Sequence, residues 1–213
     1  MKPYYDHAGI TLYHGDCREI LPGLGRFDLL LTDPPYGIDY SAQNQNLPNA
    51  TIRDNIAGDD SVELASFAVA SVEQASNAVI FGANCFPQLL PHRGRWLCWD
   101  KRICENADKM LGSPFELAWE NRHSGFDSMV RVLHGGVVNA DGGKRQHPTQ
   151  KPVALFRRIV QRYKNAQTIL DPFAGSGTTL VAAKLEGRKA VGIEINERYC
   201  EIAAKRLAQG VLF

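Results

Sequence analysis

The sequence predicts an α/β fold in which a mostly parallel sheet has helices on both faces. Three short runs are mostly apolar, which is typical of strands buried on both sides of a parallel sheet. Each run leads into a turn with an acidic residue, and stretches with helical periodicity lie between the runs. The runs are residues 27–31, 168–170 and 190–193, and their acids are Asp33, Asp171 and Glu194.

Length and composition indicate an ordinary globular protein. The 213 residues suit one domain, which we expect to span 1–213 with a small loop-rich insertion at 121–146. No apolar stretch approaches the roughly 20 residues of a membrane span, and the N-terminus lacks the apolar core of a signal peptide. The five cysteines are scattered, with no spacing that suits zinc. We therefore expect a cytoplasmic protein and no metal site.

Local patterns predict the elements of the first half of the chain. An alternating, β-prone segment at 10–14 ends in Gly15-Asp16, where Asp16 either caps a helix at 18–21 or accepts a hydrogen bond from a ligand. A helix at 61–75 and a buried strand at 77–82 follow. Two more strands, 95–100 and 115–120, have no long helical pattern between them, which favours antiparallel pairing.

The second half alternates helices and strands. A proline-punctuated turn at 146–152 precedes a helix at 153–163, and another helix at 180–186 stops at Gly187. Asn196 is expected to cap the last helix, 197–208.

The stretch from Leu29 to Gly37 changes abruptly from an apolar run to an acid, two prolines and an aromatic residue. Pro34 and Pro35 have no backbone N–H to donate, so the strand must end there. The stiff backbone projects Asp33 and Tyr36 from the carboxyl edge of the sheet, where ligands bind in open α/β sheets. A rigid acid beside an aromatic ring suits a planar, hydrogen-bonding substrate such as a nucleobase. The alternative is a loop with a helix-capping Asp.

A second unit consists of a strand, the glycine-rich turn 171–179, a helix and a strand that ends in Glu194. Gly175 and Gly177 let the backbone approach a ligand closely, and Glu194 could accept both hydroxyls of a ribose. An NAD fingerprint fails because its third glycine is missing, and a P-loop fails because no lysine follows the glycines. Asp171 would repel a pyrophosphate but could pair with a cationic ligand, which favours S-adenosylmethionine over a dinucleotide.

Three motifs together resemble the DNA N6-adenine and N4-cytosine methyltransferases. Residues 32–37 resemble the catalytic motif of that family, 171–179 its S-adenosylmethionine-binding motif, and 147–152 the motif that precedes it. The catalytic motif comes first and the glycine motif last, which resembles the permuted β group and its small orphan or phage-type members. The resemblance spans residues 10–208 and implies a Rossmann-like methyltransferase fold with a seven-stranded sheet.

The resemblance implies a cofactor site at the ends of several strands. Asp16 and Cys17 would contact the cofactor adenine, Glu194 its ribose, and Thr149 and Lys151 its carboxylate. The residues expected around the methionine part are Asp171, Phe173, Ala174, Gly175, Ser176, Gly177 and Thr178.

The same resemblance implies that Asp33, Pro34, Pro35 and Tyr36 are catalytic. A target base must leave the duplex before its amino group can be methylated, and Tyr36 would stack on the flipped ring. Asp33 and the Pro34 carbonyl would accept the two amino hydrogens and orient the nitrogen lone pair for direct in-line displacement.

DNA is the implied substrate. The net charge of +1 gives no global basic signature, so any DNA contact must use local patches. The segment 121–146 is loop-rich and locally basic, and we expect it to meet DNA through Arg122, Lys144 and Arg145. On composition alone, a solvated loop with incidental charge is the alternative. The resemblance leaves open a homodimer and a partner restriction endonuclease.

The target is expected to be the N6 amino group of adenine, because the cytosine enzymes more often have Ser at the position of Asp33. Cytosine N4 is the nearest alternative. Methylation of a protein glutamine or an RNA base is disfavoured by the order of the motifs. A catalytically silent DNA-binding module is disfavoured because Asp33, Tyr36, Gly175, Gly177 and Glu194 are all present.

Overall fold

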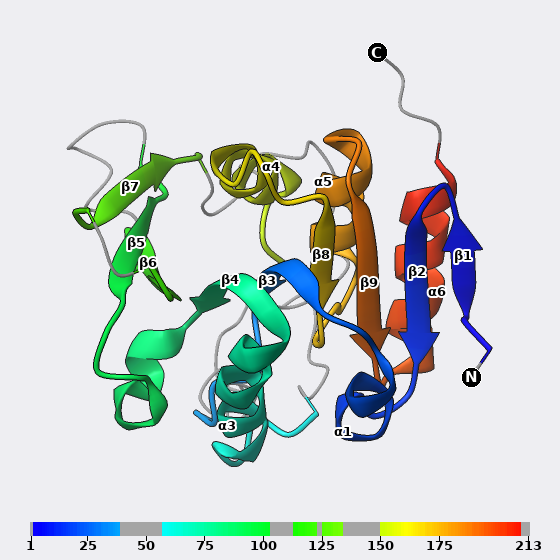
Figure 1. Cartoon of the computed structure of the whole chain (residues 1–213), viewed down its shortest axis with the longest axis horizontal. Coiled ribbons are helices and arrows are strands. Elements are labelled where there is room, and N and C mark those ends of the chain that lie inside the picture. Colours follow the sequence, from blue (N-terminus) through cyan, green and yellow to red (C-terminus); the bar gives the residue numbers. More distant parts are fainter. Residues whose placement is uncertain (1, 39–56, 103–112, 123–124, 134–149, 210–213) are drawn as a thin grey trace, which may run out of the picture.

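The computed structural model describes residues 2–38, 57–102, 113–122, 125–133 and 150–209 (Figure 1). The strands in these ranges are β1 (Tyr5–His7), β2 (Ile10–His14), β3 (Phe27–Thr32), β4 (Ala75–Phe81), β5 (Arg95–Asp100), β6 (Phe115–Glu120), β7 (Ser128–Arg131), β8 (Thr168–Asp171) and β9 (Lys189–Glu194). The α-helices are α1 (Cys17–Ile20), α3 (Glu63–Ala70), α4 (Val153–Arg162), α5 (Thr178–Leu185) and α6 (Glu197–Ala208). Short 3₁₀ helices are η1 (Leu21–Gly23), η2 (Ser71–Gln74), η3 (Ala83–Cys85) and η4 (Pro87–Leu89).

The described strands form one nine-stranded sheet in the order β1-β2-β9-β8-β3-β4-β6-β5-β7. Strands β2, β9, β8, β3 and β4 are parallel to one another. Strand β6 is antiparallel to both β4 and β5, so β5 and its parallel neighbour β7 run in the same direction as the first group. The carboxyl ends of all these parallel strands therefore share one edge, called the carboxyl edge below, and the start of β6 lies at this edge too.

The architecture confirms the predicted α/β fold with a mostly parallel sheet and helices on both faces, and the antiparallel pairing of β5 and β6 was also predicted correctly. Two short edge strands, β1 and β7, were not predicted, and β7 lies inside the segment expected to be loop-rich. The helix predicted at 61–75 is shorter, because α3 ends at Ala70 and residues 71–74 form η2. The Asp16 side chain caps α1 by accepting a hydrogen bond from Arg18 N.

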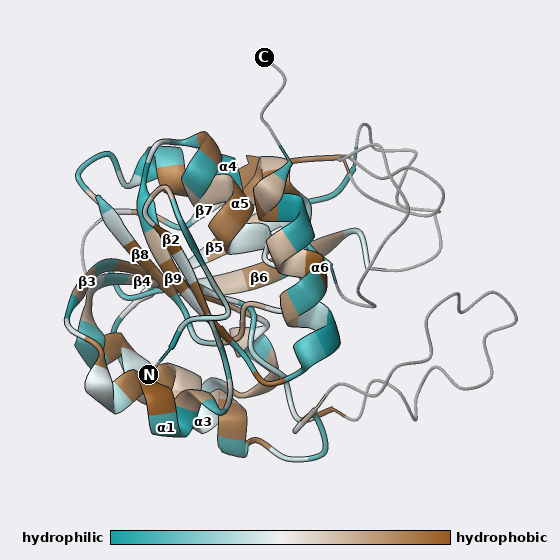
Figure 2. Cartoon of the chain, turned by 90° about the vertical axis from the view of Figure 1, so that its right-hand side faces the viewer, coloured by the Kyte–Doolittle hydropathy of each residue, from teal (hydrophilic) through white to brown (hydrophobic). Residues whose placement is uncertain are grey.

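Helices cover both faces of the sheet. Figure 2 shows α4, α5 and α6 on one side and α1 and α3 on the other. Side chains alternate across a strand, so Leu29 and Leu31 of β3 pack under α4 and α5, whereas Leu30 packs on the opposite face with Ile20 and Ala65. A continuous apolar strand is thus explained by burial on both sides. No helix among the described residues is long and apolar enough to cross a membrane.

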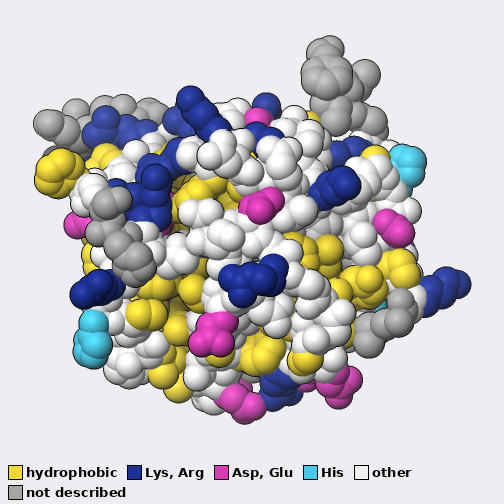
Figure 3. All heavy atoms as spheres, viewed as in Figure 1, with side chains coloured by type: hydrophobic (Ala, Val, Ile, Leu, Met, Phe, Trp, Pro, Cys, Tyr) yellow, Lys and Arg dark blue, Asp and Glu magenta, His cyan; other side chains and the backbone are white. Residues whose placement is uncertain are grey.

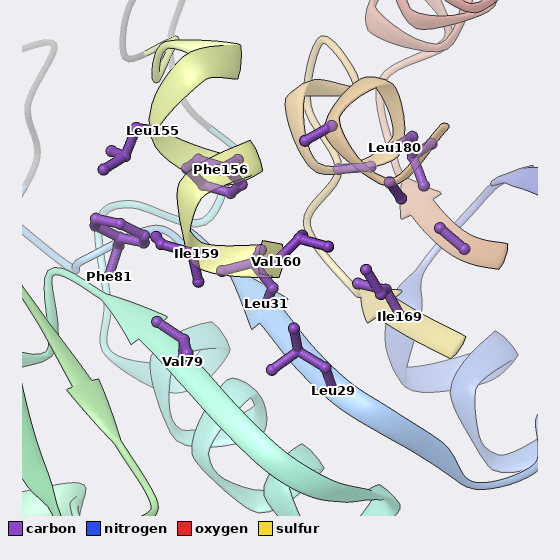
Figure 4. Packing of buried hydrophobic residues seen from close by; sticks show 14 of the residues in the cluster. Leu29, Leu31, Val79, Phe81, Leu155, Phe156, Ile159, Val160, Ile169 and Leu180 are labelled. Carbon is purple, nitrogen blue, oxygen red and sulfur yellow. The ribbon is translucent and has the colours of Figure 1, made fainter. Parts of the chain in front are cut away.

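The contact between α4 and β4 fixes the helix that follows the 146–152 turn. The rings of Phe156 and Phe81 stack with centroids 5.3 Å apart and an interplanar angle of 13° (Figure 4). Leu155, Ile159 and Val160 of the same helix are fully buried beside them. Because Lys151 stands just before this helix, the packing of α4 also determines where the Lys151 side chain lies.

Replacement of Phe156 by alanine should lower the free energy of unfolding by about 3–5 kcal/mol, since it removes a buried aromatic ring and leaves a cavity. Urea denaturation followed by circular dichroism measures the change. Gln161→Ala, on the exposed side of the same helix, is the control and should cost less than about 1 kcal/mol. Equal effects of the two substitutions would contradict this view of the core.

Candidate active site at the carboxyl edge of the sheet

The turn that follows β3 is held by a buried aspartate. The backbone N–H groups of Tyr36 and Gly37 both donate to Asp59 Oδ1, at 2.8 and 2.9 Å. Asp59 is 4% exposed, and Gly37 has φ of 72°, a value that favours glycine. Prolines 34 and 35 and these hydrogen bonds together give the turn a rigid shape. The role of Asp59 was not predicted, because it lies 23 residues after Tyr36.

The Tyr36 ring lies directly against the end of β4. A Cβ atom at Gly82 would come within 2.0 Å of Tyr36 Cε1, and Gly82 also has φ of +66°. Phe86 borders the ring from the next turn, with centroids 6.5 Å apart. The space beside the aromatic ring thus depends on a residue without a side chain, a requirement that the apolar strand pattern before Gly82 does not reveal.

Asp33, Tyr36 and Lys151 form one hydrogen-bonded group. The Tyr36 hydroxyl donates to Asp33 Oδ1 at 2.5 Å, and Lys151 Nζ donates to Asp33 Oδ2 at 2.7 Å and to the Tyr36 hydroxyl oxygen at 3.1 Å. Glu116 Oε2 lies 3.1 Å from Lys151 Nζ, and Glu116 Oε1 lies 2.5 Å from Lys101 Nζ. Each carboxylate oxygen of Asp33 keeps a second lone pair that can accept a hydrogen from a substrate.

Burial and charge oppose each other in this group. Desolvation raises the pKa of Asp33, while the Lys151 ammonium and the Tyr36 hydroxyl act in the opposite direction. Burial also disfavours a charged Lys151, but the carboxylates of Asp33 and Glu116 outweigh it and hold the Lys151 pKa well above its ordinary value. The Glu116 pKa is about 2, because the attraction of Lys151 and Lys101 exceeds the cost of desolvation. The net effect raises the Asp33 pKa, whereas Lys151 and Glu116 stay charged at neutral pH.

The carboxylate of Asp171, the first residue of the glycine-rich turn, is hydrogen-bonded to other residues of the chain. Its Oδ1 accepts hydrogen bonds from Thr32 Oγ1 at 2.7 Å and Phe173 N at 3.1 Å, and its Oδ2 accepts one from Thr179 Oγ1 at 2.5 Å. Burial raises the Asp171 pKa to about 6, although these hydrogen bonds oppose the shift. Both oxygens thus have partners within the chain, and the carboxylate links β3, β8 and α5. Its predicted pairing with a cationic ligand stays a prediction.

Three neighbouring strands bring a second set of polar groups to the carboxyl edge. Gly175 N and Asn196 N each donate to the Glu194 carboxylate at 2.8 Å, which fixes its orientation. Gly15 N donates to the Glu194 carbonyl at 3.0 Å, so Asp16 stands beside this acid. Arg18 pairs with Asp16 at 2.6 Å. Two carboxylates at adjoining strand ends fit the hydroxyl and amino groups of a nucleoside.

Other predicted cofactor residues lie around this set. Cys17 and Ala174 are buried, whereas Phe173 is half-buried and packs against the apolar cluster that includes Ile20 and Ala65. Ile195, which was not predicted, is 51% exposed directly after Glu194 and offers an apolar surface to a planar ring.

Residues 176–178 of the glycine turn contact α6 and the backbone of Lys151. Ser176 accepts hydrogen bonds from Arg206 of α6, and Thr178 Oγ1 donates to the Lys151 carbonyl at 3.3 Å. A Cβ at Gly177 would approach that of Ala203 to 2.8 Å, so this glycine serves helix packing. Lys151, predicted at the cofactor carboxylate, contacts the catalytic turn in this structure, and its contact with the cofactor stays a prediction. Thr149 lies outside the described residues.

Two arginines at the carboxyl edge were not among the predicted DNA contacts. Asp100, at the end of β5, pairs with Arg102 and Arg131, each at 2.9 Å, and these interactions lower the Asp100 pKa. The Arg131 side chain is 70% exposed. Figure 3 shows Lys and Arg side chains gathered on the side of the molecule where β5, β7 and α4 lie.

The predicted DNA contact Arg122 lies elsewhere. It follows the end of β6, which runs antiparallel to β4, and its neighbour Asn121 bonds to Ala78 near the middle of β4. Arg122 therefore points away from the carboxyl edge of the sheet and stacks over Tyr163 at 5.5 Å. Its contribution to DNA binding stays a prediction, and Lys144 and Arg145 lie outside the described residues. Among the described residues, no cluster of His, Cys, Asp or Glu could hold a metal ion.

Comparison with known proteins identifies relatives of this chain. A family model described as DNA methylase, for the N6/N4 methyltransferases, matches residues 99–205. The type II methyltransferase M.ScaI of Streptomyces caespitosus is 26% identical over 264 residues, covering 97% of this chain and 84% of that protein. M.HpaI of Haemophilus parainfluenzae is 45% identical over 108 residues, covering 50% of this chain and 30% of that protein. The DNA adenine methyltransferase YhdJ of Escherichia coli K12 is 52% identical over 62 residues, covering 29% of this chain and 21% of that protein.

Solved structures show the same fold. The M1.HpyAVI–SAM complex has a TM-score of 0.57 and 21% identity, covering 94% of this chain and 100% of that one. The cytosine-N4-specific PvuII DNA methyltransferase has a TM-score of 0.65 and 13% identity, covering 100% and 91%. The sheet order and these similarities define a methyltransferase fold of the Rossmann-like type. The chain belongs to the DNA methylase family that comprises the N6-adenine and N4-cytosine enzymes.

The raised Asp171 pKa predicts a specific pH dependence of stability. An unfolded Asp loses its proton near pH 4, whereas Asp171 in the folded chain keeps it until about pH 6. The contribution of Asp171 to the free energy of unfolding therefore falls by on the order of 3 kcal/mol as the pH rises through that window. Urea denaturation of wild type and Asp171→Asn should show the wild-type advantage shrinking from pH 4 to pH 7. A constant or growing advantage would contradict the assignment.

Proposed function

We propose that this protein transfers a methyl group from S-adenosylmethionine to the exocyclic N6 amino group of an adenine that has been flipped out of DNA. The observation on which this depends is the pairing of a rigid, half-buried Asp33 with the Tyr36 ring at the carboxyl edge of the sheet. Family membership supports DNA as the substrate class.

The cofactor assignment is supported by the side chains that lie at or just after the ends of β2, β8 and β9. Glu194 presents an oriented carboxylate to a ribose, Asp16 presents an acceptor for an adenine amino group, and Ile195 presents an apolar surface. The structural relative M1.HpyAVI was solved as a complex with SAM. S-adenosylmethionine, when bound, would supply an electrophilic methyl group. Thr149 and Lys151 are proposed to contact its carboxylate, and residues 171–178 its methionine part.

The residues of the catalytic turn bind and orient the target base. Tyr36 stacks on the flipped ring, which offsets part of the unstacking cost of a few kcal/mol. Asp33 and the Pro34 carbonyl accept the amino hydrogens, so the nitrogen lone pair faces away from them. Pro35 keeps the turn rigid. The nitrogen becomes positively charged as it accepts the methyl group, and the Asp33 carboxylate stabilises this charge until the nitrogen releases one of its protons to solvent.

Adenine is proposed as the target for two reasons. Asp33 occupies a position that is more often Ser in the cytosine enzymes that the motif resembles, and one relative is described as a DNA adenine methyltransferase. Cytosine N4 remains the second candidate, because the PvuII enzyme shares the fold. The order of the motifs supports membership of the permuted β group. We also propose that the protein acts in the cytoplasm as a single domain. Residues 121–146 would recognise the target DNA sequence.

Asp33→Ala should lower the rate of methyl transfer at least about a hundredfold, since it removes the acceptor that stabilises the developing charge. Incorporation of radiolabelled methyl groups from S-adenosylmethionine into unmethylated genomic DNA measures the rate. Asp33→Asn keeps the shape of the side chain and should be equally impaired. Cofactor binding, measured by calorimetry, should persist in both variants. Full activity in folded Asp33→Asn would rule out this role of the carboxylate.

Arg131→Ala should weaken DNA binding and reduce the salt slope of the affinity by about 1, as expected for the loss of one phosphate contact. Arg122→Ala is the matched control, because Arg122 lies away from the carboxyl edge, and its effect should be smaller. Fluorescence anisotropy with duplex DNA at several salt concentrations compares the two. A larger effect of Arg122→Ala would place the DNA on another face of the protein.

A further inference from the structure

Glu116 belongs to none of the recognised motifs, yet it lies within the candidate site. It is the second residue of β6, which enters the sheet from the carboxyl edge because the strand runs antiparallel to its neighbours. Its two oxygens contact two different ammonium groups, Lys101 at 2.5 Å and Lys151 at 3.1 Å. Its side chain is 30% exposed, and that of Lys151 is only 7% exposed.

The position of Lys151 creates a difficulty for the proposed reaction. Its ammonium contacts the same carboxylate that must stabilise positive charge on the target nitrogen. An unshared Lys151–Asp33 pair would be electrically neutral and would offer little to a developing cation. The second carboxylate, from Glu116, attracts the same ammonium at 3.1 Å, and this leaves more of the Asp33 charge for the substrate.

We propose that Glu116 is a positioning residue that shares the Lys151 ammonium with Asp33, so that Lys151 does not fully neutralise the ionised Asp33 carboxylate that faces the target amino group. Lys101 holds Glu116 in place through its other oxygen. This inference rests on the proposed function, since it assigns Glu116 a part in the same methyl transfer.

The charged groups that face Asp33 determine how a Glu116 substitution should act. They are Tyr36 on its own turn, Lys151 before α4 and Glu116 on β6, and Asp171 on β8 interacts with Asp33 from a greater distance. The Glu116 charge raises the Asp33 pKa. Its removal should lower that pKa and move the acid limb of the pH–rate profile to lower pH. Removal of the Lys101 charge should move the limb to higher pH.

The test compares Glu116→Gln, Lys101→Met and the control Glu201→Gln. Glu201 pairs with Lys205 at 2.6 Å on α6, so this control breaks a similar ion pair away from the site. Methylation of unmethylated genomic DNA is measured from pH 5 to 9, giving kcat and KM for DNA. The Asp33 carboxyl carbon is also titrated by NMR in the free protein, which requires no activity.

Glu116→Gln should lower kcat on the order of tenfold, with a smaller change in KM, because one charge near the reacting atoms is lost. The Asp33 titration should shift in opposite directions in Glu116→Gln and Lys101→Met, whereas loosening of the fold would shift both in the same direction. Equal kcat in Glu116→Gln and Glu201→Gln, or shifts in one direction, would overturn the inference. Absence of methylation by wild type would instead overturn the proposed function, and the NMR titration would still test the charge sharing.

Discussion

The ion pair between Asp33 and Lys151 is the interaction on which the candidate site depends. These residues are 118 positions apart in the chain, and their side chains meet at 2.7 Å where β3 ends and α4 is about to begin. An ammonium that is 7% exposed cannot be left without partners, because burying an unpaired charge is strongly destabilising. The turn after β3 and the turn before α4 must therefore keep their relative positions. The stacking of Phe156 of α4 on Phe81 of β4 helps to hold them there.

Two further contacts connect this pair to the glycine-rich turn. The Lys151 carbonyl accepts a hydrogen bond from Thr178 at the start of α5, and Asp171 accepts one from Thr32, the last residue of β3. The glycine turn and the catalytic turn are thus held together by these two hydrogen bonds. For a reaction that requires in-line alignment of two substrates, such fixed geometry supplies much of the rate.

Much of the fold could be predicted from local patterns, because burial on both faces of a parallel sheet makes strands such as 27–31 mostly apolar. The strand β7 was not predicted, because it has only four residues and one of its two apolar side chains, Met129, is exposed. Asp33 and Tyr36 were recognisable from the motif, whereas the partners of Lys151 were not, since spacing along the chain does not reveal which carboxylates meet it. The position of Arg122 depends on the direction of β6, which local sequence does not report.

The central claim is that the catalytic turn accepts an adenine amino group from DNA. The most direct test is to incubate the purified protein with unmethylated genomic DNA and labelled S-adenosylmethionine, digest the DNA to nucleosides and separate them by chromatography. Label in N6-methyldeoxyadenosine is the expected result. Label in N4-methyldeoxycytidine would contradict the choice of base, and label in neither nucleoside, with the cofactor bound, would contradict the function itself.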